Sequence, residues 1–152
     1  MELKEYLELS EKTYVDLEDI HKNNTYLLLN LSSIYLTYFI PTIIKDSKNT
    51  TDKLIKIGGD MMFLLANYAR LNNIRFAFYG TEPLDDLGSL LGQLVNIHNQ
   101  NINRDEEVNW EVCERNLQSI LSHLQAFYNS LGVNLRDVIN AHAEGLKTNS
   151  ED

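Results

Sequence analysis

Hydrogen-bonding side chains recur along one face of two apolar segments of this chain. Asn116, Ser119 and His123 are spaced by three and four residues, so they share one face of a helix. Asp60 and Asn67 share the corresponding face of an earlier segment. Hydroxyls and amides donate hydrogen bonds to a phosphate, whereas carboxylates without a metal repel one. The spacing therefore indicates a polar pocket that accepts a phosphate-containing ligand.

The segments that carry these side chains read as two copies of one helix. Each copy has a short polar opening, a long apolar run, and an asparagine- or glycine-containing stop before a β-branched residue; the copies are Ile55–Ile74 and Arg115–Val133. Each also has a partner segment upstream, Leu31–Tyr38 and Leu87–Leu94 respectively. The chain is therefore predicted to be an all-α bundle of two helical-hairpin repeats, at about 24–74 and 83–133.

Periodicity and stop signals place the individual helices within a single domain, 1–147. The predicted helices are Glu2–Tyr14, Asn24–Ile44, Lys53–Asn72, Pro83–Asn99, Val108–Leu131 and Leu135–Lys147. Pro41 is expected to kink or restart the second of them, and Gly132 to end the fifth. The link 75–82 is interpreted as core contacts rather than a strand, and the tail 148–152 is predicted to be disordered.

Composition limits the classes of partner. The 152 residues carry a net charge of −9, which repels nucleic acid and anionic membrane surfaces. The single cysteine, Cys113, excludes an internal disulfide and fits a buried thiol in a reducing cytoplasm. Thr25–Ile44 is uncharged and nearly long enough to span a bilayer, but its serines, threonines and Asn30 favour a buried bundle helix. The sequence predicts a cytoplasmic protein with no membrane and no nucleic-acid partner.

Several stretches of the chain resemble the MazG-like nucleotide pyrophosphohydrolases. KIGGDMMFLLANYARLNNI is similar to that family's Glu-Leu-Gly-Asp helix, and LSHLQAFYNSLGVNLRDVINAHAEGLK is similar to the end of its domain. LGSLLGQL matches the spacing of the family's Leu-x-Glu-Glu-x-x-Glu-Leu helix, and MELKEYLELSEKT its opening helix. The resemblance implies an all-α fold in which carboxylates hold Mg²⁺ while a nucleoside triphosphate is cleaved between its α and β phosphorus atoms.

At the positions where the resemblance implies metal-binding carboxylates, this chain has almost none. In the first copy they fall on Ser33, Ile34, Thr37, Ile57 and Asp60, and in the second on Ser89, Leu90, Gln93, Asn116 and Ser119. Only Asp60 is a carboxylate. The family's Asn and Lys of the last helix become His142 and Gly145. Because Mg²⁺ needs hard, charged oxygen ligands, catalysis of the family's kind is expected to be absent, with no catalytic residue, metal or cofactor.

The residues that stand in place of the family's carboxylates are mostly polar and neutral. Loss of the metal site with selection for core packing alone would be expected to give leucine, valine or alanine at these positions. We therefore predict a non-catalytic nucleotide-binding protein with a MazG-like frame, which sequesters or senses a nucleotide signal in the manner of a phage-encoded sponge. The predicted ligand-binding residues are Ser33, Thr37, Asp60, Asn67, Ser89, Gln93, Asn116, Ser119 and His123. A homo-oligomer is expected, because the Asn24–Ile44 helix is apolar nearly all round.

Two alternatives stay open. The first is a working Mg²⁺-dependent pyrophosphohydrolase that combines Asp60 with Asp85, Asp86, Glu111 or Glu114. The second is a structural or protein-interaction bundle, in which the polar side chains bond one another or, as Ser and Thr in helices often do, a backbone carbonyl one turn earlier.

Overall fold

A long central helix, α4, organises a chain whose described regular elements are all helices. The structure is a computed structural model that describes residues 1–14, 16–78, 80 and 82–151, with α7 side chains described through 148. The elements are α1 (Leu3–Thr13), α2 (Ile20–Ile34), the π-helical turn η1 (Tyr35–Phe39), α3 (Ile40–Lys45), α4 (Thr50–Leu71), α5 (Leu87–Arg104), α6 (Trp110–Ser130) and α7 (Leu135–Glu151). No strand occurs among the described residues, which confirms the all-α class.

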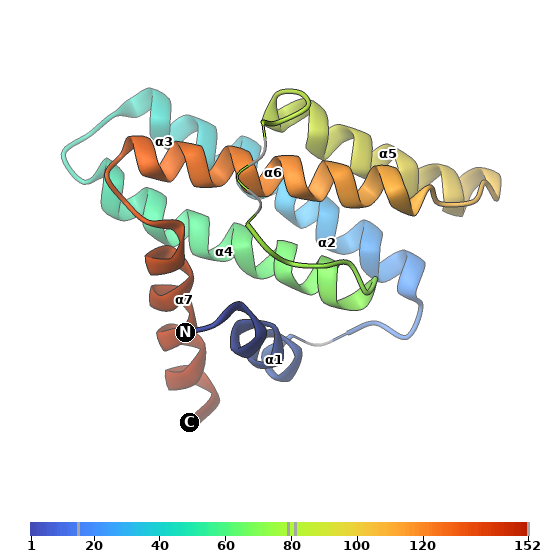
Figure 1. Cartoon of the computed structure of the whole chain (residues 1–152), viewed down its shortest axis with the longest axis horizontal. Coiled ribbons are helices and arrows are strands. Elements are labelled where there is room, and N and C mark those ends of the chain that lie inside the picture. The colour runs from blue at the N-terminus through green and yellow to red at the C-terminus, as the bar shows by residue number, and fades with distance from the viewer. Residues whose placement is uncertain (15, 79, 81, 152) are drawn as a thin grey trace.

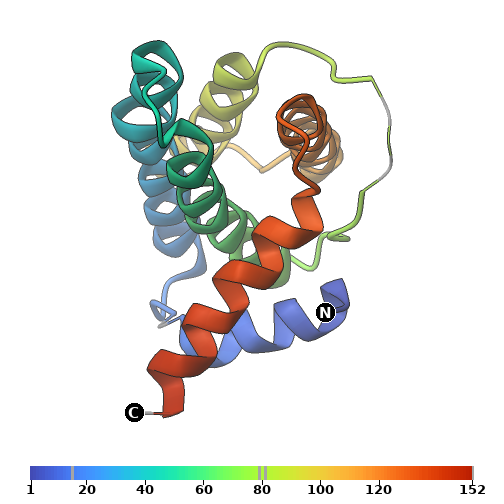
Figure 2. The same ribbon diagram turned by 90° about the vertical axis from the view of Figure 1, so that its left-hand side faces the viewer.

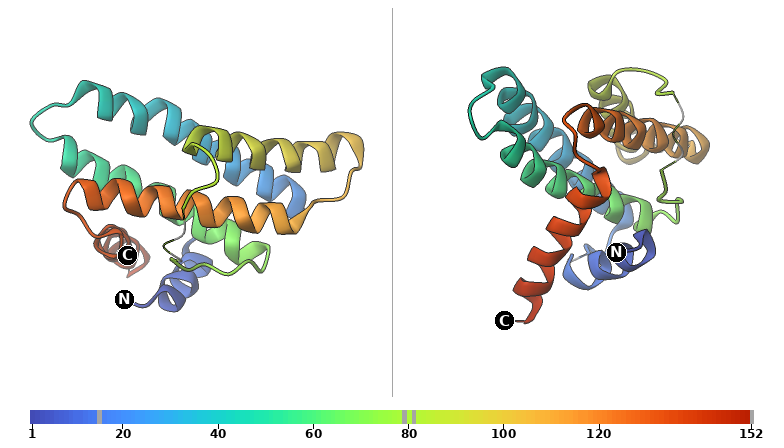
Figure 3. Two further views of the ribbon diagram at one scale, coloured as in Figure 1. Left: turned by 45° about the horizontal axis from the view of Figure 1, so that its top comes forward. Right: turned by 60° about the vertical axis from the view of Figure 1, so that its left-hand side comes forward.

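The helices surround α4 on several sides. The α4 helix packs against α1, α2 and α7, while α5 packs against both α2 and α6 (Figure 1). The α1 and α7 helices lie together on one side of the other helices, which brings both termini to that side (Figures 2 and 3). One buried core runs through these contacts, and α4 supplies much of it, including Leu54, Met61, Met62, Leu65 and Tyr68.

Several helix boundaries differ from the sequence-based ones because side-chain caps decide them. Asp19 caps α2 by accepting from the backbone N–H groups of His21 and Lys22 at 2.9 and 3.3 Å, so this helix begins before Asn24. Asp86 caps α5 in the same way, so that helix begins at Leu87 rather than at Pro83. The tail 148–152 was predicted to be disordered, but α7 continues past Lys147 to Glu151, so residues 148–151 are helical, and Asp152 lies outside the described residues.

The α4 and α6 helices end in the same geometry, as their similar stop signals predict. Asn73 and Gly132 both adopt positive φ, at 55° and 74°. The next residue then donates back into the last turn: Ile74 N–H to the Ala69 carbonyl, and Val133 N–H to the Tyr128 carbonyl, each at 2.9 Å. This is the six-to-one bond of a Schellman motif.

Pro41 lies in the first turn of α3, where α-helical geometry resumes after the η1 turn, and it does not interrupt the helical backbone. Proline lacks an N–H group, and its ring collides with the carbonyl four residues earlier. The chain instead widens into the η1 turn just before it, where Ile40 N–H bonds the carbonyl of Tyr35, five residues back. The wider turn inserts one extra residue and lets helical backbone continue from Ile20 to Lys45.

The link between α4 and α5 contains no strand in its described part. Phe76 is buried in the core and Phe78 packs against it, as expected for core contacts. Gly80 turns the chain with φ of 65°. Tyr79 and Thr81 lie outside the described residues. Cys113, predicted to be a buried thiol, is buried, and that burial raises its pKa.

Two adjacent glycines set how closely other helices approach α4. The phenol of Tyr128 on α6 reaches over Gly58 and donates to the carbonyl of Leu54. A Cβ at Gly58 would collide with that phenol, and a Cβ at Gly59 would lie 2.9 Å from Cβ of His142 on α7. Glycine at both positions leaves room for these contacts, one with the Tyr128 side chain and one with the α7 helix itself.

Gly58→Ala is therefore expected to destabilise the fold by about 1–3 kcal/mol, because the new methyl group displaces the Tyr128 phenol. Gly92→Ala on α5 is the matched control: its Cβ meets nothing within 4 Å. Because alanine loses less backbone conformational entropy than glycine on folding, that variant should be about 0.5–1 kcal/mol more stable. Urea unfolding measures both, and equal effects would contradict a steric role for Gly58.

The burial of His98 should make the folded protein less stable in acid. It is buried on α5, and Tyr68 OH lies 2.7 Å from its Nε2. Burial, with a smaller contribution from His21, lowers the pKa of His98 to about 4. The unfolded chain, with a histidine pKa near 6.5, therefore takes up the proton first as pH falls. Stability is complete above about pH 6.5 and is lost toward pH 4, by at most about 3 kcal/mol from this group.

His98→Gln, which keeps an acceptor for Tyr68 but does not titrate, should flatten the pH dependence of unfolding free energy between pH 6.5 and 4. His21→Gln, on the exposed start of α2, should retain most of that dependence, because burial is the larger cause of the His98 shift. Urea titrations at four pH values decide the matter. The same slope in wild type and His98→Gln would rule out this group as the source.

Candidate functional site

The structure brings five of the nine predicted ligand-binding residues together where α5 meets α6. They are Ser89 and Gln93 on α5 and Asn116, Ser119 and His123 on α6. Asn116 is buried and donates from Nδ2 to Oε1 of Gln93 at 3.0 Å. Gln93 in turn donates to the carboxylate of Asp85 at 3.4 Å. The grouping expected from helical spacing is thus present, and within it Asn116 bonds Gln93.

The segment just before α5 engages the rest of this polar cluster. The N–H of Leu84 donates to Oγ of Ser119 at 3.2 Å, and Nε2 of His123 donates to the carbonyl of Asp85. Asp86 accepts from both the N–H and the hydroxyl of Ser89, at 2.8 and 3.0 Å. These bonds from Ser89, backbone first, lower the pKa of Asp86. The cluster therefore fixes residues 84–86 on the α5–α6 pair.

The first-copy residues are not gathered in one place. Ser33 and Asp60 line a cavity of about 280 Å³ between α2 and α4. Thr37 is exposed in the η1 turn. Asn67 is buried and its oxygen accepts from Arg70 at 2.8 Å, while Arg70 also binds Asp16 at 2.8 Å. Asn67 therefore ties α4 to the link between α1 and α2, away from Asp60.

A second cavity lies on another side of Asp60, between α4 and α7. Its volume is about 570 Å³, and its lining residues are Asp52, Ile55, Lys56, Gly59, Asp60, Ala141, His142, Gly145 and Leu146. The walls are partly apolar, and charged or titratable groups stand among them. Such a mixture is typical of small-molecule sites. We call this cavity the α4–α7 groove.

His142 is held in the groove by a residue from the other end of the chain. The OH of Tyr6 on α1 lies 3.0 Å from Nδ1 of His142, and the ring of Phe63 lies 5.2 Å from the imidazole. Nε2 of His142 is 3.5 Å from the carboxylate of Asp60. Burial, and then the charge of Asp60, raises the pKa of Tyr6, so its phenol stays protonated. A phenol that donates to Nδ1 leaves the ring hydrogen on Nε2.

The groove includes residues that the sequence reasoning missed. Lys56 was not singled out, although it stands one helical turn before Asp60, a spacing that places both on one face. His142 was treated only as a lost family residue. Tyr6 carries no local signal at all, because it lies 136 residues from the histidine it contacts.

Acidic residues do not converge into a metal site. Among residues 1–14, 16–78, 80 and 82–151, no group of three or more His, Cys, Asp or Glu side chains is placed to hold a metal ion. Asp85 and Asp86 are engaged at the start of α5, and Asp60 faces His142. No carboxylate cage of the kind that Mg²⁺ requires is formed within this part of the chain.

Comparisons with family models, with curated proteins and with solved structures found no match to this chain.

The α5–α6 polar cluster predicts a measurable coupling between two side chains. Asn116→Leu and Gln93→Leu each remove one partner of the 3.0 Å bond, and each should cost about 0.5–1.5 kcal/mol of unfolding free energy. In the double variant neither side of the Asn116–Gln93 bond is left unpaired, so the combined cost should be smaller than the sum by about 0.5 kcal/mol or more. Strict additivity in chemical denaturation would show that the two residues act independently.

Proposed function

We propose that this protein binds a nucleotide or a related phosphate-containing small molecule, without hydrolysing it, in the α4–α7 groove. The observation that carries the proposal is the position of Asp60. It is the single carboxylate left at the positions implied by the MazG-like resemblance, and it stands in a cavity of about 570 Å³ beside His142 and Lys56. That volume is in the range of small-molecule sites.

The groove offers donors and an acceptor suited to the two ends of a nucleotide. The Lys56 ammonium and the Nε2–H of His142 both donate to phosphate oxygens. Asp60, whose side chain is 62% exposed, accepts from a sugar hydroxyl or a base amino group. Ile55 and Leu146 supply apolar wall for a base.

The Asp60–His142 pair leaves both groups available to a ligand. At 3.5 Å, and with a carboxylate that is 62% exposed to solvent, it is a weak interaction, so a ligand displaces it at little cost. Tyr6 meanwhile holds the opposite edge of the imidazole. A ring that is fixed at Nδ1, and whose Nε2 makes only the weak contact with Asp60, is pre-organised for binding, which reduces the entropy lost when a ligand is ordered.

Binding without turnover is favoured over Mg²⁺-dependent hydrolysis by the placement of the acidic residues. The hydrolase alternative needs Asp60 to combine with Asp85, Asp86, Glu111 or Glu114. Asp85 and Asp86 instead hold the start of α5, and Asp60 lies toward α7. A cytoplasmic protein of MazG-like frame, built from two helical hairpins, would then sequester or sense its ligand, as a phage-type sponge does.

The structural-bundle alternative draws its support from the α5–α6 polar cluster. Asn116, Gln93, Ser119 and His123 all bond other parts of the chain. Of the predicted ligand residues, Asp60 is the one that lies in the α4–α7 groove, so the proposal depends on that groove and not on the cluster.

Lys56→Glu should weaken ligand binding at least about tenfold, because it replaces a phosphate donor with a repelling carboxylate. The purified chain would be mixed with nucleoside triphosphates, cyclic dinucleotides and ADP-ribose derivatives, with and without Mg²⁺. Filtration, heat release and mass spectrometry then identify what stays bound and what is cleaved. Calorimetry on any bound compound compares the variants.

Lys53→Glu is the matched control, since it makes the same charge change on α4 at an exposed residue outside the groove. Its affinity should stay near that of wild type. Intact ligand bound without metal supports the proposal. Monophosphate and pyrophosphate formed only with Mg²⁺ would establish the hydrolase instead, and no binding across the panel would leave the structural bundle.

A further inference from the structure

Asp60 borders a second cavity besides the α4–α7 groove. This cavity, of about 280 Å³, lies between α2 and α4, and we call it the α2–α4 cavity. Its lining residues are Asn30, Ser33 and Ile34 from α2 and Asp60, Phe63 and Leu64 from α4. The Asp60 side chain is 62% exposed, so it forms an open boundary between the two cavities and not a buried wall. A ligand that passes over Asp60 therefore contacts both.

The ring of Phe63 lies on the same boundary. It lines the α2–α4 cavity, and its centroid is 5.2 Å from that of the His142 imidazole, which lines the α4–α7 groove. Phe63 follows Asp60 by three residues, a spacing that places both on one face of α4. A carboxylate and an aromatic ring are therefore what a ligand meets between one cavity and the other.

The polar side chains on the α2 wall of this cavity are not used by the fold. Within the described residues, neither Asn30 nor Ser33 makes a side-chain hydrogen bond. Thr25 on the same helix does, since its hydroxyl donates to the carbonyl of His21, one turn earlier, at 3.1 Å. Ser33 thus lacks the backbone bond by which serine in a helix is often satisfied, and its hydroxyl is available to a ligand.

The helix that carries this wall is more open than the sequence indicated. A buried bundle helix was expected, but only 22% of the most apolar 18-residue segment of Ile20–Lys45 is buried. Ser33 is accordingly exposed and Asn30 is half-buried. Both side chains are therefore within reach of a molecule that enters from solvent.

The α2–α4 cavity suits an uncharged ring better than a phosphate. Its described lining contains no Lys, Arg or His, so nothing in it offsets the charge of Asp60, which repels an anion. The Asn30 amide and the Ser33 hydroxyl both donate and accept hydrogen bonds, as the edge of a nucleobase requires. Aromatic rings such as that of Phe63 stack on bases of any sequence.

Along α4 the chemistry changes in the order in which the groups of a nucleotide follow one another. Lys56, Asp60 and Phe63 are spaced by four and three residues, so they share one face over about 10 Å of helix. In turn they offer a cation for a phosphate, an acceptor for a sugar hydroxyl and a ring for a base.

We propose that the ligand is a dinucleotide whose second base lies in the α2–α4 cavity. The inference rests on the proposed function, which places one base and the phosphate in the α4–α7 groove. The second ribose donates a hydroxyl to Asp60. Its base stacks on Phe63, while Asn30 and Ser33 bond the edge of that base.

Calorimetry without Mg²⁺ compares AMP and GMP with the dinucleotides pApA, pGpG, cyclic di-AMP, cyclic di-GMP and NAD⁺. At least one dinucleotide should bind at least about tenfold more tightly than the mononucleotides. The physical reason is that its second base is tethered to the first and occupies the α2–α4 cavity as an intramolecular step. Lys56→Glu, in the groove, should weaken the binding of both kinds of ligand.

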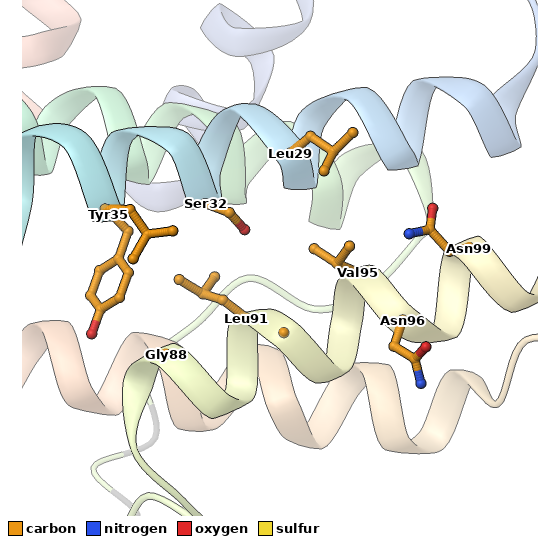
Figure 4. Close-up of a pocket in the computed structure, with 10 residues that line it drawn as sticks. Leu29, Ser32, Tyr35, Gly88, Leu91, Val95, Asn96 and Asn99 are labelled. Atoms are coloured by element: carbon orange, nitrogen blue, oxygen red, sulfur yellow. The ribbon is translucent and has the colours of Figure 1, made fainter.

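Ser33→Leu tests the cavity itself. Leucine removes a hydrogen-bonding group and fills space at an exposed position, so dinucleotide affinity should fall at least about tenfold. Ser32→Leu is the matched control, because Ser32 lines a different hollow, of about 380 Å³ between α2 and α5, with Leu91 and Val95 (Figure 4). Its dinucleotide affinity should stay near that of wild type, and thermal melts establish that both variants fold.

The possible failures separate this inference from the proposed function. Dinucleotides that bind no more tightly than mononucleotides, while Lys56→Glu weakens both, overturn the inference and leave the proposed function standing. Equal losses in Ser33→Leu and Ser32→Leu, or no loss in either, also overturn it, since the α2–α4 cavity would then have no specific part. If no nucleotide of either kind binds, the proposed function fails as well.

Discussion

The close approach of α7, and of the Tyr128 side chain from α6, to the Gly58–Gly59 pair is the constraint on which the rest of the arrangement depends. Without a side chain at Gly58, the Tyr128 phenol reaches the backbone of α4, and without one at Gly59, His142 lies against the same helix. The α4 and α7 helices are packed so closely at Gly59 that a small rotation of either one produces a clash. The α4–α7 groove thus has walls whose orientation is set by glycines rather than by its polar residues.

Polar groups serve two distinct purposes around this frame. In the α5–α6 cluster every member bonds a neighbour, and the product is a fixed loop at the start of α5. In the α4–α7 groove the polar groups remain partly solvated, and only His142 is held, through its bond to Tyr6. A polar network whose hydrogen bonds are all made adds rigidity. Polar groups that still have a donor or acceptor to offer are the ones able to bind a ligand.

The sequence predicted the helices well, whereas ligand binding by its candidate site residues remains a prediction. Apolar periodicity found the helices, and the stops at Asn73 and Gly132 are confirmed because each depends on local backbone geometry. The starts of α2 and α5 were displaced, since their caps, Asp19 and Asp86, compete with other plausible openings nearby. The duplication itself and the MazG-like relationship remain predictions.

Helical spacing correctly grouped Asn116, Ser119 and His123 on one face, because that face depends only on the pitch of one helix. Helical spacing gave no information on which other residues this face would contact. The contact of Asp85 with His123 joins residues 38 apart, and that of Tyr6 with His142 joins residues 136 apart. Such pairs are decided by tertiary packing, which one sequence without its fold does not contain.

The π turn at Tyr35–Phe39 has a consequence for how this chain is to be compared with other sequences. It absorbs one residue inside an otherwise continuous helix. A homologue that lacks Pro41 has no need of the wider turn and is free to lose that residue. The correct alignment would then place a single-residue gap in the middle of a helix, where gaps are normally penalised most heavily. An ungapped alignment would put every later position of that helix about 100° out of phase.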